Sequence, residues 1–230
     1  MNTRYKIEEI KEIVGNAKAF LFDFDGTLIN LDKLNVDGFA YVLKDMFNLD
    51  FTRDDFMKYI SGRAAQNGLV EYLDQHKIEN YSTKEIVSEF YIHKNRLIEE
   101  RIEEEIYLMP GVHKFLEYYS KSKRNIIITS SRTEYVKKML SYYSVYSYFE
   151  RVFDRYSTVR GKPGPEPFLN GLEYLKLDSS ECIAFEDSFY GLQSAKGAGI
   201  FTVGIMNEGW NDDFVYQLGD YTIQDYRELI

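Results

Sequence analysis

An apolar run that ends in two aspartates, within residues 20–28, limits the folds open to this chain. Residues 20–22 (Phe-Leu-Phe) indicate the end of a buried strand, because such strands are continuous apolar runs that stop at turn signals. Gly26 allows the turn. Asp23 and Asp25 are two residues apart, so on an extended chain their side chains point the same way. A divalent cation would relieve the repulsion between them; a surface pair in a loop is the alternative.

The composition is that of a globular protein, with 44% hydrophobic and 28% charged residues. At 230 residues the chain forms one large domain, or a core with a smaller insert. The net charge of −9 argues against a nucleic-acid or anionic-membrane partner, because phosphate-rich surfaces attract basic proteins. It does not argue against a small phosphate ester, because a local cation can reverse the field at one site.

The single cysteine, Cys182, rules out an intramolecular disulfide and suits a reducing compartment. Residues 1–18 are charged and lack the apolar segment of a signal peptide, and no stretch is long and apolar enough to span a membrane. We therefore expect a cytoplasmic protein. His76, His93 and His113 show no metal-ligand spacing.

Residues 32–107 read as helices without a clear strand, which predicts a helical domain inserted between two parts of an α/β core, residues 1–31 and 108–230. The helices predicted in the insert are 34–47, 52–60, 64–73 and 83–106. An extra helix at 5–14 precedes the first strand, 17–24, and we expect it to pack on the core; a dimer contact is the second possibility.

From residue 108 the pattern alternates between helix and strand, which predicts a Rossmann-like parallel sheet with right-handed crossovers. The predicted helices are 112–120, 133–143, 167–175 and 192–198, and the predicted strands are 125–128, 149–153, 182–185 and 200–204. From residue 212 onward we expect short elements that close the sheet edge. Ligands of such sheets bind outside the carboxyl ends of the strands.

Further polar residues follow the predicted strands or lie in the adjoining loops. Thr129 ends one strand, where its hydroxyl and the following N–H groups suit a phosphoryl oxygen or an ordinary helix cap. Lys162 lies in a loop with three prolines between 163 and 167, and these prolines stiffen the loop. A stiff loop would hold the lysine in place, where it could neutralise the charge of a transferring phosphoryl group. A surface lysine is the alternative. Glu186 and Asp187 follow another strand and suit Mg²⁺.

Together these four segments resemble the motifs of the haloacid dehalogenase-like (HAD) hydrolases, in the subgroup of beta-phosphoglucomutase and phosphoglycolate phosphatase. The resemblance implies that Asp23 is a nucleophile that forms an aspartyl-phosphate and that Asp25 is the general acid and base. It assigns phosphate binding to Thr129, Ser130 and Lys162. The metal ligands of Mg²⁺ would be Asp23, Asp25 through its carbonyl, Asp187 and Glu186, the last directly or through water.

The helical insert matches the position and length of the family's cap, which helps to select the substrate. Arg63 lies where the cap's substrate loop should fall, and Arg132 follows the second motif, so both are candidate substrate contacts; for Arg132 a solvated surface arginine is the preferred interpretation. Beta-phosphoglucomutases carry a histidine and an arginine where this chain has Asn35 and Ala65, which disfavours a mutase.

We therefore predict an α/β protein with a Rossmann-like parallel sheet and a helical cap, acting as a Mg²⁺-dependent phosphatase on a small phosphate monoester such as a sugar phosphate. A hexose-phosphate mutase and a non-catalytic HAD-like binding protein are the alternatives. The substrate and the oligomeric state stay open.

Overall fold

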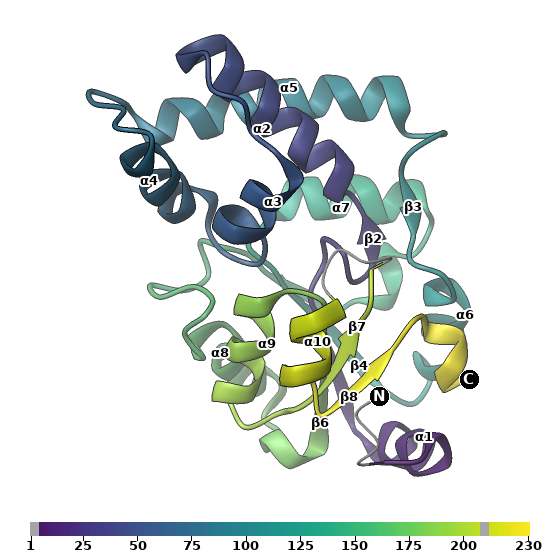
Figure 1. Cartoon of the computed structure of the whole chain (residues 1–230). Helices are drawn as coiled ribbons and strands as arrows, with labels where there is room; N and C mark the ends of the chain where they lie inside the picture. The colour runs from purple at the N-terminus through teal and green to yellow at the C-terminus, as the bar shows by residue number, and fades with distance from the viewer. Residues whose placement is uncertain (1–4, 208–211) are drawn as a thin grey trace. The chain divides into compact units, whose positions relative to one another are not determined.

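The computed structural model describes residues 5–207 and 212–230 (Figure 1). Its contacts divide the chain into two compact units. The core unit consists of Met1–Ile29 with Leu108–Ile230, and the helical unit consists of Asn30–Tyr107.

The core unit is built on a six-stranded sheet in the order β5-β4-β1-β6-β7-β8, and every paired strand is parallel. This confirms the predicted α/β class. The chain runs outward from β1 through β4 to β5 and returns on the other side of β1, so the carboxyl end of β1 is the point where the strand order reverses. The strands are β1 Ala19–Phe22, β4 Arg124–Ile128, β5 Arg151–Phe153, β6 Cys182–Glu186, β7 Phe201–Ile205 and β8 Tyr221–Ile223.

Alternating side chains of the central strands supply two separate cores. On one face Leu21 belongs to a cluster with Phe168 of α8 and Ala195 of α9. On the other face Phe22 stacks on Phe185, with a centroid separation of 4.9 Å, among aromatic rings of α6 and the C-terminal 3-10 turn Tyr226–Leu229. The helices of this unit are α1 Ile7–Asn16, α6 Val112–Tyr119, α7 Thr133–Tyr142, α8 Glu166–Leu175, α9 Phe189–Gly197 and α10 Asp212–Leu218.

The register of the sheet brings three strand ends level. Phe22 at the end of β1 pairs with Ile127 of β4 and with Phe185 of β6. Because the strands are parallel, the polar residues that follow them emerge at one edge. This alignment, rather than any local signal, brings the candidate functional residues together.

The predicted N-terminal helix packs on the core unit, as expected. Ile10 and Val14 of α1 are fully buried, and Lys11 Nζ donates a hydrogen bond to the carbonyl of Ile230 at 2.8 Å. The predicted closing of the sheet edge is also confirmed, because β8 pairs with β7 at the end of the sheet. The first strand is shorter than predicted, at Ala19–Phe22.

The helical unit contains α2 Asp32–Phe47, α3 Arg53–Asp55, a π-helical turn Phe56–Ile60, α4 Ala65–Gln75 and α5 Thr83–Arg101. Two of the predicted helix starts are capped by side chains. Asp55 N donates to Thr52 Oγ1 at 3.2 Å, and Glu85 N donates to Ser82 Oγ at 3.3 Å.

The prediction of one helix over 83–106 was wrong at its end, because α5 stops at Arg101 and residues 102–105 form turns. Three glutamates, residues 103–105, would lie at the negative end of the helix dipole if it continued. The turn instead brings Glu105 Oε1 to 2.9 Å from Lys33 Nζ. The single helix predicted over 52–60 is also divided, into α3 and the π-helical turn.

Two short strands that the sequence did not predict, β2 Ile29–Asn30 and β3 Tyr107–Leu108, pair where the chain leaves and re-enters the core unit. Asn30 Nδ2 donates to the Tyr107 hydroxyl at 2.8 Å. Across 5–207 and 212–230, none of the helices combines the length and the apolarity that a membrane crossing requires.

Candidate active site

The site begins with a buried lysine between two carboxylates at the carboxyl edge of the sheet. Asp23 follows β1, and its backbone N–H continues the ladder to the Phe185 carbonyl at 2.9 Å. Lys162 Nζ donates to Asp23 Oδ1 at 2.5 Å and to Glu186 Oε1. Lys162 is 4% exposed and Asp23 is 6% exposed, so two carboxyl groups hold the ammonium group in a largely dry environment.

The loop that carries Lys162 is fastened at both ends. The carboxylate of Glu166, the first residue of α8, accepts hydrogen bonds from the backbone N–H groups of Val159 at 2.7 Å and Arg160 at 3.0 Å. From α9, Ser194 Oγ donates to the Gly164 carbonyl at 2.5 Å. These bonds agree with the stiff loop expected from its prolines, and a stiff loop lowers the entropic cost of holding the lysine in place.

Glu186 anchors both the lysine and the following turn. Its Oε2 accepts hydrogen bonds from the backbone N–H groups of Asp187 at 3.0 Å and Ser188 at 3.1 Å, and from Ser188 Oγ at 2.9 Å. Ser188 also caps α9 by accepting from Gly191 N. A Cβ at Gly191 would lie 1.8 Å from Glu186 Oε1, so only glycine leaves room for this carboxylate.

Asp187 is positioned by the turn after β1. Thr27, which is fully buried, donates from Oγ1 to Asp187 Oδ1 at 2.8 Å. Gly26 has a φ of +82°, and a Cβ there would lie 2.2 Å from Asp187 Oδ2. Gly26 is therefore required both by its backbone conformation and by the close approach of this carboxylate.

Asp23, Glu186 and Asp187 each bring one carboxylate oxygen to within 4.8 Å of the others, and all three residues are buried. Burial raises the pKa of Asp23 to about 8; the charge of Lys162 opposes this shift and that of Glu186 adds to it. Hard oxygen donors gathered in this way fit Mg²⁺, which prefers oxygen ligands and is commonly held by few carboxylates.

Asp25 is held by a residue to which the sequence assigned no role. Ser131 Oγ donates to Asp25 Oδ2 at 2.5 Å, and Ser131 N donates to Thr129 Oγ1 at 3.0 Å. Thr129 and Ser131 are buried, whereas Ser130, which was predicted to bind phosphate, is half-buried. A serine three residues after the strand is the only signal that could have pointed to this contact.

Comparison with known proteins identifies the family. The family model for haloacid dehalogenase-like hydrolases matches residues 20–205. The chain belongs to the haloacid dehalogenase-like hydrolases. This confirms the resemblance inferred from the four motifs.

Relatives within the HAD family carry more than one activity in their names. The chain is 28% identical to the phosphorylated carbohydrates phosphatase of Thermotoga maritima, over 80% of this chain and 82% of that protein. It is 26% identical to the beta-phosphoglucomutase of Bacillus subtilis, over 82% of this chain and 83% of that protein. The structure of CbbY from Rhodobacter sphaeroides superimposes with a TM-score of 0.80 at 19% identity, covering 93% of this chain and 96% of CbbY, which supports the HAD-like fold.

The two arginines proposed as substrate contacts of this HAD hydrolase lie in different units. In the helical unit, the Arg63 guanidinium donates twice to the Glu71 carboxylate at 2.9 Å and from Nε to the Tyr59 carbonyl at 2.6 Å. In the core unit, Arg132 is half-buried at the start of α7. Their contact with a substrate stays a prediction.

Proposed function

We propose that this HAD hydrolase is a Mg²⁺-dependent phosphatase that hydrolyses a small phosphate monoester, of the sugar-phosphate class, through an aspartyl-phosphate on Asp23. The observation that carries the proposal is the contact of Lys162 with Asp23 beside the carboxylate of Asp187, at the carboxyl edge of a parallel sheet. A cation and a nucleophile are thereby held together in a buried site.

In the first step, Asp23 attacks the phosphorus atom and the bond from phosphorus to the ester oxygen breaks. Asp25 gives a proton to the leaving oxygen, and the alcohol departs. Lys162 neutralises part of the negative charge on the transferring phosphoryl group. Mg²⁺ bound by Asp23, Asp187 and the Asp25 carbonyl, with Glu186 as a further ligand, would supply additional positive charge.

In the second step, water attacks the phosphorus atom and gives a proton to Asp25, and the bond between phosphorus and Asp23 breaks. Inorganic phosphate leaves, and both aspartates return to their starting forms. Ser131 acts as a positioning residue here, because its hydrogen bond fixes the Asp25 carboxyl group, which must first donate a proton to the leaving oxygen and then accept one from water. Thr129 and Ser130 would bind phosphoryl oxygens.

The test is phosphate release with Mg²⁺, and with EDTA, across sugar phosphates, phosphoglycolate, nucleotides, pyrophosphate and p-nitrophenyl phosphate. We expect Mg²⁺-dependent release from at least one monoester and the highest kcat/KM for a phosphorylated carbohydrate. A folded protein that releases phosphate from none of these compounds with Mg²⁺ would contradict the proposal.

A hexose-phosphate mutase is the second candidate, because the Bacillus subtilis beta-phosphoglucomutase is 26% identical to this chain. Asn35 and Ala65 stand where mutases of this subgroup have a histidine and an arginine, which favours the phosphatase. The two functions are separated by incubation with beta-glucose 1-phosphate and a catalytic amount of glucose 1,6-bisphosphate. A mutase forms glucose 6-phosphate with little free phosphate, whereas the phosphatase releases phosphate.

Replacing Thr27 with valine is expected to weaken Mg²⁺ binding about tenfold, because loss of a residue that orients a metal ligand typically has this effect. Thr27→Val keeps the side-chain shape but removes the hydrogen bond to Asp187. Thr202→Val is the matched control, since Thr202 of β7 is equally buried but its hydroxyl donates to the Ile200 carbonyl, just before the strand. Calorimetric titration with Mg²⁺ gives both affinities. Equal affinities in the two variants would contradict the orienting role of Thr27.

Mg²⁺ binding is expected to strengthen about tenfold per pH unit up to about pH 8 and then to level off. The pKa of Asp23 is raised to about 8, so below this pH a cation must displace a proton from the carboxyl group. The pKa of Asp23 is higher in the folded protein than its ordinary value of about 4, so the uncharged form of Asp23 stabilises the folded state. This stabilisation is complete below about pH 4 and is lost as the pH rises to about 8.

Mg²⁺ should therefore raise the Tm more at pH 8 than at pH 6, because both the metal affinity and the repulsion that it relieves are greater at the higher pH. Thermal unfolding with and without Mg²⁺ at several pH values measures this difference. In Asp23→Asn the pH dependence between 6 and 8 should largely disappear. An equal Mg²⁺ effect at both pH values in the unaltered protein would contradict the raised pKa.

A further inference from the structure

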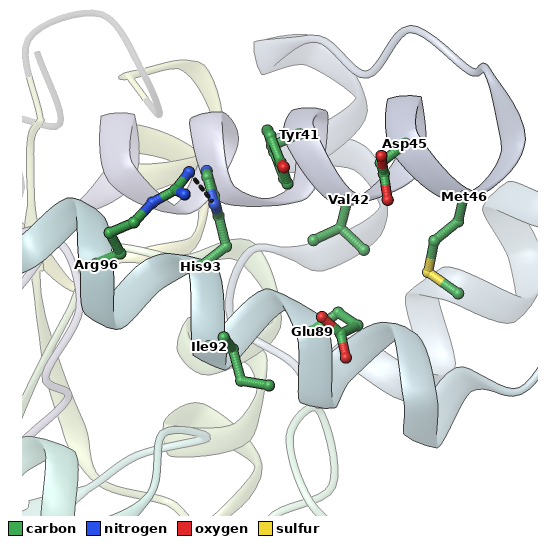
Figure 2. A pocket seen from close by; sticks show the side chains of 8 residues that line it. All are labelled: Tyr41, Val42, Asp45, Met46, Glu89, Ile92, His93 and Arg96. Atoms are coloured by element: carbon green, nitrogen blue, oxygen red, sulfur yellow. Dashed lines mark hydrogen bonds between the residues drawn. The ribbon is translucent and has the colours of Figure 1, made fainter.

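The paired helices of the helical unit carry a hollow of about 260 Å³ on their surface (Figure 2). Asp37 of α2 pairs with Arg101 of α5 at 2.6 Å. One turn further along α2, Tyr41 stacks on His93, which lies two turns earlier in α5. Helices α2 and α5 are therefore antiparallel. The residues that line the hollow come from both helices and are placed by this alignment.

The residues that line the hollow carry opposite charges at its two ends, and Arg96 also lies 3.8 Å from Glu100 of its own helix. Asp45 and Glu89 lie at one end, and Arg96 lies at the other (Figure 2). Arg96 Nη2 contacts His93 Nδ1 at 2.9 Å, and the Arg96 guanidinium lies 5.6 Å from the centre of the Tyr41 ring. Glu89 and Arg96 are seven residues apart on one helix, which separates their Cα atoms by about 10 Å along the axis.

The surface of the hollow is largely apolar between and beside these ends. Ile92 is 61% exposed, Tyr41 is 50% exposed and Met46 is 38% exposed, and Val42 completes the lining between the helices. A contiguous set of exposed apolar side chains flanked by charges is typical of a protein interaction site.

We propose that this α2–α5 face binds the same face of a second copy of the chain, related by a two-fold axis. A two-fold axis that lies in the plane of the interface and runs across the two helices turns one end of the face onto the other, so Arg96 of each copy meets Glu89 and Asp45 of the other copy. Ile92 and Tyr41 of the two copies then cover each other. The face is complementary to itself in both charge and polarity, which a two-fold dimer requires.

The size of the face predicts a weak dimer. Helices of 16 and 19 residues are about 24 and 28 Å long, and two of them side by side are about 20 Å wide. This gives about 500 Å² per copy, below the roughly 800 Å² of a standard stable interface. Monomer and dimer should therefore exchange at micromolar protein concentration, and added salt should favour the monomer because the paired charges lie near the surface.

The test is sedimentation velocity of the full chain between about 1 and 300 μM at low salt. We expect a shift from monomer to dimer in this range. Arg96→Glu and Glu89→Arg should each weaken self-association at least tenfold, because each variant places like charges opposite each other. In an equimolar mixture the two variants should recover the dimer, since the glutamate introduced in one copy meets the arginine introduced in the other only in the mixed pair.

Lys121→Glu, a charge reversal at an exposed position of the core unit, is the control and should dimerise like the unaltered chain. Circular dichroism establishes that each variant is folded. A monomer at every concentration would overturn the proposal. Dimerisation that both single reversals leave unchanged would also overturn it, because the contact would then use another face. Phosphate release is not a readout, so this test is independent of the proposed function.

Discussion

Asp23→Asn is expected to lower phosphate release by about 10⁴-fold or more, as removal of a covalent nucleophile does in other hydrolases. An amide has almost the same shape as the carboxylate but cannot form the aspartyl-phosphate. The variant should fold, because burial already favours an uncharged group at this position and raises the pKa of Asp23 to about 8. The loss would therefore report on chemistry rather than on unfolding.

The matched control is Asp50→Asn, since Asp50 is exposed in the helical unit and pairs with Lys44 at the surface. This variant should keep full activity. Asp25→Asn separates the two aspartates further. With p-nitrophenyl phosphate, whose leaving group needs no proton, it should release one equivalent of nitrophenol rapidly and then stall at the aspartyl-phosphate. Steady release of phosphate by Asp23→Asn would exclude Asp23 as the nucleophile.

Lys162→Met is expected to lower kcat by about 10³-fold, as loss of a positioned group that stabilises transition-state charge does elsewhere. The unbranched methionine keeps most of the lysine stem but removes the ammonium group that bonds Asp23 and Glu186. Two buried carboxylates then lose their counter-charge, so the metal-free variant should also be less stable than the unaltered protein, and more so at high pH.

Lys196→Met is the control for this change, because Lys196 is 39% exposed in its side chain and pairs with Asp220 near the surface. It should change stability by no more than about 1 kcal/mol and leave kcat unaltered. Steady-state phosphate release with Mg²⁺ measures kcat, and thermal unfolding without Mg²⁺ at pH 6 and pH 8 measures the stability. A Lys162→Met protein with normal kcat would show that the lysine holds the structure together without acting on the phosphoryl group.

Much of the candidate site could be located from local sequence patterns. Asp23, Glu186 and Asp187 each follow an apolar run, and Lys162 lies in a loop stiffened by prolines. Parallel strands bring their carboxyl ends to one edge whatever the details of packing. Strand ends are therefore informative about a site even when the residues that follow them are far apart along the chain.

The contacts that orient these residues could not be predicted in the same way. Thr27 bonds Asp187, and Ser131 bonds Asp25, across separations of 160 and 106 residues. The hydroxyl of each could equally have capped a helix or faced water. Their partners depend on the register between β1, β4 and β6, which no local pattern specifies.

The end of α5 shows the same limit in the fold. Residues 102–105 have good helix propensity, yet the helix stops at Arg101, where Arg101 bonds Asp37 of α2. Propensity sums contributions within a segment, whereas this boundary is set by charge pairs between segments that are distant along the chain.

The amino-acid sequence alone predicts the order of the core strands and helices, the run of helices between them, and the acidic residues at the strand ends, because hydrophobic periodicity and turn residues act over a few positions. The pairing of Lys162 with both Asp23 and Glu186 and the charged ends of the α2–α5 face arise only when distant segments pack. Such contacts depend on three-dimensional distance, which a linear pattern of residues does not contain.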